Sequence, residues 1–505
     1  MQQCLWDTTQ RVPDQEAVVD VHGAKRKTYS QLCKDVETLA AGLLALGLKK
    51  GDRLGMWGPN SYEWIVTQFA TAQAGIILVS VNPAYQAKEL EYVLKKVGCS
   101  ALVFPDRFKT QRYYEILRSI CPEIETSPAG GIKSKALPDF RIAIVLDKKH
   151  PGAFHFEEVM SAGTTQHLKQ LHDIQKSVSC EDPINVQFTS DCRIAIPVPL
   201  YHCIGSVLGS LTAVMYGPTM VLTSPSFQSR AVLEAVSKEK CSIISGTPTM
   251  YIDMLAEPDF ATLSSTLTTG IIAGSIVPPE IMKKLLNETT LRNMVVGYGT
   301  TENSPVTFMG FLYDDIFRKV DTVGYVMSHT EAKVVDTKTE QILPVNASGE
   351  LWIRGFGVML GYWDEEERTK ECITPEGWYK TGDIATLDEY GYCRIVGRCK
   401  DMIIRGGENI YPAEIEQFLH THPKVMEAQI IGVKDARMGE EICACIRTHS
   451  DQECTAEELK AYCKGQISHF KIPRYIIFVN EYPLTISGKV QKFKLKEIME
   501  KQLKL

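Results

Sequence analysis

The sequence predicts a layered α/β protein, with a large N-terminal domain of largely parallel sheets and a small, mobile C-terminal α+β domain. Three observations predict this class. The chain of 505 residues is too long for one compact core. Helix-like and strand-like stretches alternate through most of its length. From residue 397 onward, a cluster of glycines and charges is followed by short alternating elements, enough for a small second domain.

The first elements along the chain show the pattern most clearly. Residues 29–46 carry apolar side chains at helical spacing and end at Gly47, which predicts a helix with a glycine stop. Residues 53–57 predict a short strand and residues 76–81 a buried one. Helices between short buried strands favour parallel sheets. We place the domain boundary at about Arg398, which gives domains over 1–397 and 398–505.

The charge and hydropathy of the sequence argue against two classes of binding partner, nucleic acid and membrane. A net charge of -6, from 55 basic and 61 acidic residues, gives no general attraction for nucleic acid or anionic membrane. Residues 65–87 and 194–229 contain no charged side chain and are long enough to span a bilayer. Because Gln68 and Gly217-Pro218 interrupt these stretches, we expect buried helix–turn–strand units and no transmembrane segment.

The 15 cysteines contain no C-x-x-C pair, which favours reduced thiols over zinc sites or a disulfide framework. Cys443 and Cys445 are placed at strand spacing, so both are expected in a core, with a metal site as the alternative. The N-terminus shows no basic leader, and no transit peptide is predicted. The C-terminal residues 503–505 resemble a peroxisomal address only loosely.

A run of small polar residues, 298–305 (YGTTENSP), follows the strand-like residues 294–296. It is therefore expected beyond the carboxyl end of a strand, where open α/β sheets bind ligands. Tyr298 is suited to stacking on a base, Thr300 and Thr301 to donating to a phosphate, and Glu302 to holding Mg²⁺. The structural alternative is a Gly-Thr-Thr turn with a capping glutamate.

Three later segments carry further polar candidates. Asp383 follows a glycine turn and is suited to accepting hydrogen bonds from ribose hydroxyls, although turn chemistry alone explains such an aspartate. Residues 397–412 contain paired glycines that permit close ligand approach or a backbone rotation, with a plain linker as the alternative. Lys489 lies on a glycine turn and can reach a phosphate or carboxylate as a point charge, or have no role.

In this order, the segments resemble the core motifs of the adenylate-forming (AMP-binding) superfamily, which includes acyl-CoA synthetases, luciferases and the adenylation domains of peptide synthetases. The resemblance runs from Gly51 to Lys489, and residues 56–61 and 200–203 resemble medium-chain acyl-CoA synthetases. It implies a ligase that uses ATP, Mg²⁺ and coenzyme A and forms an acyl-adenylate from a fatty acid. It also implies a mitochondrial location, with the cytoplasm as the alternative. A luciferase or peptide-synthetase module is a distant alternative.

The resemblance also implies roles for individual residues. Asp383 and Arg398 hold the ribose, and Tyr298 lies against the adenine. The remaining nucleotide-binding and catalytic residues are Thr300, Thr301, Glu302 with Mg²⁺, and Lys489, which stabilises charge between carboxylate and phosphate. The acyl or adenine pocket comprises His202, Gly246, Thr247, Gly274 and Ser275, with a core histidine as the alternative for His202. Lys400 is the hinge, and the CoA-step loop comprises Arg405, Gly406, Gly407 and Glu408.

One motif of the superfamily is incomplete. Its phosphate loop is a Thr-Ser-Gly-Thr-Thr-Gly-x-Pro-Lys run rich in donors, but here Thr189-Ser190 is followed by Asp191. Residues 200–202 then come several dozen positions too early. We therefore expect an in-frame internal deletion at about 190–195. It makes two alternatives to a working ligase possible: an impaired isoform that retains at most AMP, acyl or partner binding, and an unfolded product.

Overall fold

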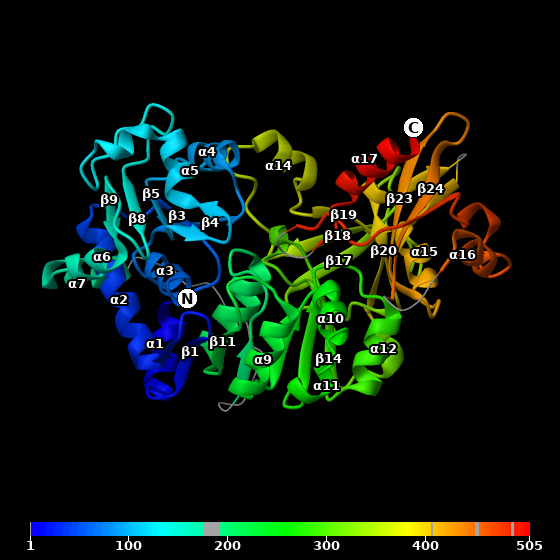
Figure 1. The fold of residues 1–505 in the computed structure, drawn as a ribbon, viewed down its shortest axis with the longest axis horizontal. Coiled ribbons are helices and arrows are strands. Elements are labelled where there is room, and N and C mark those ends of the chain that lie inside the picture. Colours follow the sequence, from blue (N-terminus) through cyan, green and yellow to red (C-terminus); the bar gives the residue numbers. More distant parts are fainter. Residues whose placement is uncertain (1, 176–191, 406–407, 450–453, 486–488) are drawn as a thin grey trace. The chain divides into compact units, whose positions relative to one another are not determined.

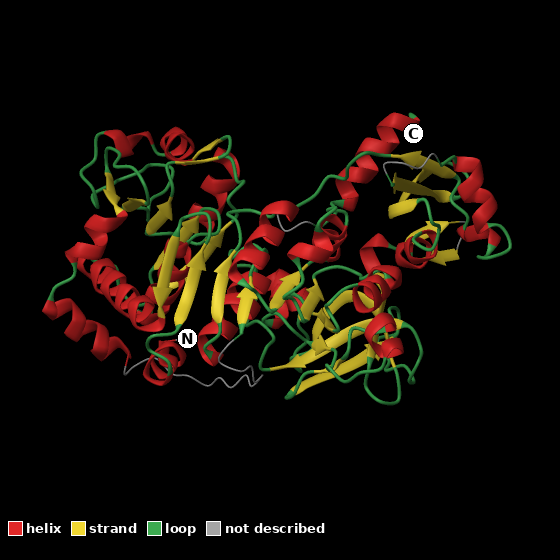
Figure 2. Ribbon diagram, turned by 60° about the horizontal axis from the view of Figure 1, so that its bottom comes forward, coloured by secondary structure: helices red, strands yellow, loops and turns green. Residues whose placement is uncertain are grey.

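A computed structural model describes residues 2–175, 192–405, 408–449, 454–485 and 489–505 (Figure 1). The chain divides into two compact units, the first over 1–245 and 262–267 and the second over 246–261 and 268–505. Helices and strands alternate within them, as Figure 2 shows in red and yellow. The fold class is α/β, as predicted, and the predicted domain boundary at Arg398 lies inside the second unit and stays a prediction.

The first unit contains a five-stranded, fully parallel sheet in the order β4-β3-β5-β8-β9. Its strands are β3 (Arg53–Trp57), β4 (Ile77–Val81), β5 (Ala101–Phe104), β8 (Ile142–Val145) and β9 (Ala153–His155). Helices α4 (Ala87–Lys96) and α5 (Tyr113–Ile120) pack on it through a continuous buried core. In that core the Trp57 and Tyr113 rings meet edge to face at 4.5 Å. The strand predicted at 53–57 is confirmed. The strand predicted at 76–81 forms β4, but its predicted burial is wrong, because β4 lies at the edge of the sheet and only Val81 within it is buried.

Helix α2 (Tyr29–Ala45) confirms the helix predicted over 29–46. It begins with a capping box, in which Thr28 and Gln31 satisfy each other's backbone N–H groups. Gly47 follows with a φ of 85°, a conformation that favours glycine. The helix packs beside α3 (Tyr62–Gln73), α6 (Phe156–Ala162) and α7 (Thr165–Gln175). The amphipathic pattern in the sequence is therefore satisfied by burial between helices.

A second sheet of the first unit has the order β2-β1-β11-β10-β12, with only β1 and β2 antiparallel. Its strands are β1 (Glu16–Asp20), β2 (Lys25–Thr28), β10 (Arg193–Ala195), β11 (Thr219–Leu222) and β12 (Ile243–Gly246), and α9 (Ser229–Glu239) precedes β12. The uncharged stretch 194–229 forms β10, a π-helix (Ile204–Leu211), α8 (Thr212–Tyr216) and β11, which confirms a helix–turn–strand unit. Among the residues that the structure describes, none of the helices combines the length and apolar character of a membrane span.

Strand β10 begins at Arg193, which is fixed by two glutamates. Its guanidinium donates to Glu16 at 2.8 Å and to Glu239 at 2.9 Å. Arg26 bridges the same two carboxylates, at 2.6 Å and 2.8 Å. The Glu239 side chain is only 6% exposed. This network of two arginines and two glutamates therefore holds the start of β10 in place close to the predicted break in the sequence.

The same network makes stability depend on acid pH. The Arg26 hydrogen bond, together with Arg193, lowers the pKa of Glu16 from 4.5 to about 2. Because the pKa of Glu16 is lower in the folded state than in the unfolded state, the ionised side chain stabilises the fold. This stabilisation is complete above about pH 4.5 and is lost as the pH falls toward 2. We expect Glu16→Gln to lower the free energy of unfolding by about 1 kcal/mol at pH 7, because the pair is partly exposed. In urea titrations the difference from wild type should shrink at pH 3, and a pH-independent difference would contradict this.

The second unit begins with a mixed sheet. Strand β13 (Thr269–Ala273) runs parallel to β14 (Asn293–Tyr298), and β15 (Phe308–Met309) and β16 (Tyr325–Val326) continue it antiparallel. Helices α10 (Pro248–Leu255), α12 (Pro279–Glu288) and α13 (Ile316–Asp321) belong to the same unit, and the residues of α11 (Phe260–Leu263) are divided between the two units. The strand predicted at 294–296 is thus the centre of β14. The polar run 298–305 starts at its carboxyl end, as predicted.

Residues 330–398 form a four-stranded sheet that is antiparallel throughout. Its strands are β17 (Thr330–Val335), β18 (Gly349–Gly355), β19 (Tyr379–Leu387) and β20 (Cys393–Arg398), with α14 (Glu366–Cys372) between β18 and β19. Two successive strands that pair in parallel need a long crossover connection. The connection between β19 and β20, residues 388–392, is short and therefore suits an antiparallel hairpin. The parallel sheets predicted for the N-terminal part are therefore supplemented here by an antiparallel one.

The C-terminal residues form another sheet, in the order β22-β21-β24-β23, with β25 parallel to β24. Its strands are β21 (Ile403–Arg405), β22 (Glu408–Ile410), β23 (Val425–Asp435), β24 (Gly439–Thr448) and β25 (Tyr475–Phe478), and its helices are α15 (Pro412–Leu419), α16 (Ala456–Cys463) and α17 (Lys492–Leu503). This is the α+β composition predicted for the tail. Cys443 and Cys445 lie buried on one face of β24 against Leu495 and Met499, which confirms their predicted place in a core.

Candidate nucleotide-binding and catalytic site

The loop after β14 folds tightly back on itself. At Gly299, a side-chain Cβ would lie 1.7 Å from the carbonyl oxygen of Pro305, so only glycine permits this approach. A single 3₁₀ turn then covers Thr301–Asn303, with Thr301 exposed and Thr300 half-buried. The predicted hydroxyl residues Thr300 and Thr301 therefore lie at the carboxyl end of β14. The close backbone approach at Gly299 constrains the conformation of this loop.

Asp383 lies opposite Arg398 in the pairing of β19 with β20, and its carboxylate contacts both Arg398 and Tyr298. The Tyr298 hydroxyl donates to Asp383 Oδ2 at 2.6 Å. The Arg398 Nε lies 3.2 Å from Asp383 Oδ1. Asp383 is only 5% exposed, whereas the Arg398 side chain is largely exposed. Three residues predicted from separate segments of the sequence are thus brought together.

Burial and charge act in opposite directions on this group. Burial raises the pKa of Asp383, while the Tyr298 hydrogen bond and the charge of Arg398 lower it. Burial, followed by the Asp383 carboxylate, holds the pKa of Tyr298 well above its ordinary value. Tyr298 therefore stays a phenol and donates. The carboxylate is held in one orientation by two protein donors, and its remaining lone pairs suit further hydroxyl donors.

Glu302 is held from the segment before α14. The Tyr362 hydroxyl donates to Glu302 Oε1 at 2.8 Å, and the Met359 N–H donates to the Glu302 carbonyl at 2.7 Å. Within the described part of the chain, no three His, Cys, Asp or Glu side chains cluster as a metal cage. Mg²⁺ does not need such a cage, since it is commonly bound by one carboxylate together with substrate phosphates. A single oriented glutamate therefore fits the predicted magnesium role.

The C-terminal candidates occupy turns and strand ends. Lys489 lies next to the isolated bridge between Leu484 and Val490, and its N–H donates to Thr485 Oγ1 at 3.0 Å. Lys400 is exposed in the 3₁₀ turn Cys399–Asp401, directly after β20. Arg405 makes two hydrogen bonds to the buried Glu441, at 2.7 Å and 3.0 Å. Gly406 and Gly407 lie outside the described residues, and Glu408 begins β22.

The predicted pocket residues divide between the units. His202 belongs to the first unit, where its Nδ1 accepts from the Ile204 N–H at 3.2 Å. In the second unit, Thr247 follows Gly246 and caps α10 by accepting from the Met250 N–H. Gly274, with a φ of 96°, and the exposed Ser275 follow β13. Whether these residues line an acyl pocket stays a prediction.

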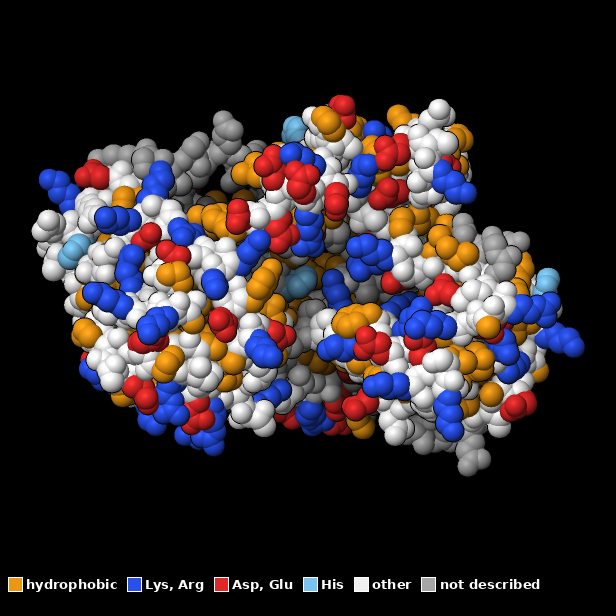
Figure 3. All heavy atoms as spheres, turned by 90° about the horizontal axis from the view of Figure 1, so that it is seen from above, with side chains coloured by type: hydrophobic (Ala, Val, Ile, Leu, Met, Phe, Trp, Pro, Cys, Tyr) orange, Lys and Arg blue, Asp and Glu red, His pale blue; other side chains and the backbone are white. Residues whose placement is uncertain are grey.

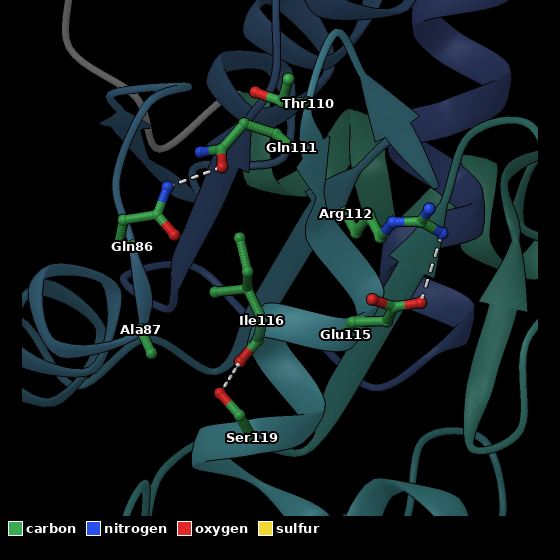
Figure 4. A pocket seen from close by; sticks show the side chains of 8 residues that line it. All are labelled: Gln86, Ala87, Thr110, Gln111, Arg112, Glu115, Ile116 and Ser119. Atoms are coloured by element: carbon green, nitrogen blue, oxygen red, sulfur yellow. Dashed lines mark hydrogen bonds and ion pairs between the residues drawn. The ribbon is translucent and has the colours of Figure 1, made fainter.

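A separate hollow of about 350 Å³ lies in the first unit between α4 and α5 (Figure 4). Gln86 donates to Gln111 at 2.6 Å across it, and Arg112 pairs with Glu115 at 3.6 Å. None of the predicted site residues lines it. On the face of the molecule in Figure 3, basic and acidic side chains are interspersed, in line with the small net charge.

Sequence comparison decides the family. The family model described as AMP-binding enzyme matches residues 5–191 and 165–363, and the model for the C-terminal domain of AMP-binding enzymes matches residues 414–489. The chain belongs to the AMP-binding enzyme family. The polar run at the end of β14 lies within the matched residues, whereas Asp383 and Arg398 lie between the two matched ranges, and their role stays a prediction.

Similar proteins cover the whole chain. The protein of Danio rerio named "Medium-chain acyl-CoA ligase ACSF2, mitochondrial" is 57% identical over 537 residues, 100% of this chain and 89% of the relative. The Homo sapiens protein of the same name is 54% identical over 540 residues, 100% of this chain and 88% of the relative. A crystal structure of the anthranilate CoA ligase AuaEII with anthranoyl-AMP has a TM-score of 0.85 at 22% identity and covers 100% of this chain and 98% of that one, which shows the shared fold.

The lengths of these alignments bear on the incomplete phosphate loop. The match with the Danio rerio protein extends over 537 residues although this chain has 505, so the relative carries residues that have no counterpart here. The AMP-binding family model also matches in two pieces, which overlap over residues 165–191. Both facts agree with a missing internal segment. Its predicted position falls partly on residues 176–191, outside the described structure, and stays a prediction.

Two contacts of the site were missed by the sequence analysis. Tyr362 lies 60 positions from Glu302 in the sequence, and Glu441 lies 36 from Arg405. Neither residue belongs to a motif that the sequence analysis used. A pattern of local spacing carries no signal for pairs that only the tertiary fold brings together.

Proposed function

We propose that the chain is an ATP-dependent acyl-CoA ligase that joins a fatty acid of medium length to coenzyme A through an acyl-adenylate. The observation that carries the proposal is the buried Asp383 carboxylate, oriented by Tyr298 and Arg398 beside the loop of Glu302. The names of the relatives supply the substrate class and a mitochondrial location. They are names of ligases and give no support to a role limited to binding.

In the first step, an oxygen of the fatty acid carboxylate attacks the α-phosphorus of ATP, and diphosphate leaves. Asp383 accepts hydrogen bonds from the ribose hydroxyls, and Arg398 keeps that carboxylate in place. Tyr298 lies against the adenine, while Thr300 and Thr301 donate to the α-phosphate. Bound at Glu302, Mg²⁺ supplies positive charge beside the phosphates.

Lys489 contributes a positive charge where negative charge develops between the carboxylate and the α-phosphate, which is the main kind of stabilisation in such transfers. In the second step, the sulfur of coenzyme A attacks the acyl carbon, and AMP leaves with the bonding electrons. We assign Lys400 as the hinge about which Lys489 withdraws between the steps. The Arg405–Glu408 segment then serves the thioester step.

The proposal is tested by trapping the intermediate. Purified protein is incubated with octanoate, ATP and Mg²⁺, and acyl-adenylate is captured as hydroxamate; acids of other lengths then define the preference. Signal is expected from wild type and from Lys494→Ala, whose exposed lysine lies outside the assigned site, but not from Lys489→Ala. If wild type gives no more hydroxamate than Lys489→Ala, the ligase proposal is wrong, and the impaired isoform is favoured.

A further inference from the structure

The hydroxyl of Tyr362 makes the hydrogen bond through which the Glu302 carboxylate is oriented. We propose that Tyr362 is a positioning residue, which fixes Oε1 of Glu302 and thereby presents Oε2 to a divalent cation bound together with nucleotide phosphates. This inference rests on the proposed function and names a residue that the sequence motifs did not include. It concerns residues of the second unit alone.

Tyr362 is itself held by the helix that follows it. Its N–H donates to Thr369 Oγ1 at 2.9 Å, and the same hydroxyl donates to the Glu365 carbonyl at 2.9 Å. The Arg368 guanidinium lies 4.2 Å from the centre of the Tyr362 ring, a cation–π contact. Backbone and ring are therefore both fixed from α14, so the hydroxyl has a defined position.

The residue before Tyr362 explains how the chain reaches this position. Gly361 has a φ of 155°, and a Cβ there would lie 2.8 Å from Thr369 Cγ2. A larger residue would therefore push α14 away from Tyr362. On the other side, the Met359 N–H holds the Glu302 backbone at 2.7 Å. Residues 359–362 thus anchor both the main chain and the carboxylate of Glu302.

The geometry of the pair suits a positioning contact. The Tyr362 hydroxyl donates to Glu302 Oε1 at 2.8 Å and so occupies one of the two carboxylate oxygens. Partners that orient a metal-binding carboxylate in this way typically contribute 10–100-fold to metal affinity. A merely structural role for Tyr362 would not change metal affinity selectively.

The test is a titration of the full chain with Mn²⁺, used as a paramagnetic substitute for Mg²⁺, in the presence of ATP. Free Mn²⁺ is measured by electron paramagnetic resonance. Tyr362→Phe is expected to weaken Mn²⁺ binding by about 10-fold or more, and Glu302→Gln at least as much. AMP binding without metal should change less than about twofold in Tyr362→Phe, because the ribose contacts remain.

The matched control is Tyr392→Phe, which removes a phenol that donates to another carboxylate, Asp314, at 2.6 Å in the same unit. It should bind Mn²⁺ as wild type does. Thr369→Val removes the hydrogen bond to the Tyr362 N–H but keeps the Tyr362 hydroxyl, so its loss of Mn²⁺ affinity should be intermediate. This variant provides the test if Tyr362→Phe does not fold. The inference would be overturned if Tyr362→Phe and Tyr392→Phe bound Mn²⁺ with equal affinity. It would also be overturned if wild type bound Mn²⁺ no more tightly than Glu302→Gln does.

These outcomes are separable from failure of the proposed function. Metal binding is read without turnover, so the inference stands if Mn²⁺ affinity falls as expected while no hydroxamate forms. Conversely, hydroxamate formation that is equally dependent on Mg²⁺ in wild type and in Tyr362→Phe would overturn the role of Tyr362 and leave the ligase proposal intact.

Discussion

Inserting, at the predicted break between Ser190 and Asp191, the residues of the Danio rerio relative that have no counterpart in this chain should raise acyl-adenylate formation at least about 10³-fold. One preorganised donor to a developing anion contributes roughly 10²–10³ in rate. The superfamily loop supplies several donors and a lysine, and the sequence stops matching it after Ser190. The measurement is hydroxamate formation from octanoate by wild type and by the insertion variant under the same conditions.

The control for this insertion is a Gly/Ser segment of equal length at the same position. It restores the spacing but not the donors, so its rate should stay near that of the uninserted chain. If both insertions raise the rate equally, chain length and not the loop's chemistry is the cause. No increase with the relative's own residues would mean that the segment predicted to be missing after Ser190 does not limit the rate.

Replacing Asp383 by Ala should weaken AMP binding about 10²-fold. Two hydrogen bonds from ribose hydroxyls to a charged acceptor contribute on the order of 3 kcal/mol together, which corresponds to that factor. Binding is measured by isothermal titration calorimetry with AMP, which does not need the phosphate loop. Tyr298→Phe, which removes one donor but keeps the carboxylate, should lose at most about 10-fold.

Two further variants separate binding from folding. Asp383→Asn keeps the shape of the buried side chain and should also bind AMP weakly, because an amide accepts these hydrogen bonds less strongly than a carboxylate. Asp321→Ala, which removes only a weak pair with Arg394 at 3.9 Å, should bind as wild type does. Wild-type affinity in both Asp383 variants would show that the ribose lies elsewhere.

The helices and strands whose formation depends on residues close together in the chain could be predicted from the sequence. Helix α2 was predicted because its apolar spacing and Gly47 lie within twenty positions of one another, whereas its capping box was seen only in the structure. Strands β3 and β14 were predicted because each is a short apolar run bounded by turns. The antiparallel sheet β17–β20 was not predicted, since the direction of pairing depends on how connections cross the fold and not on the strands themselves.

The sequence by itself determined the family, the position of the polar loop beyond β14 and the identity of the candidate residues Tyr298, Glu302, Asp383 and Arg398. These depend on residue type, order and spacing, which the chain carries directly. Only the tertiary structure decided that Tyr298 donates to Asp383, that Tyr362 orients Glu302 and that Arg405 is paired with Glu441. Each of these pairs joins segments 36–85 positions apart. Their contact is set by sheet register and by the burial of polar groups that need a partner, which no local pattern encodes.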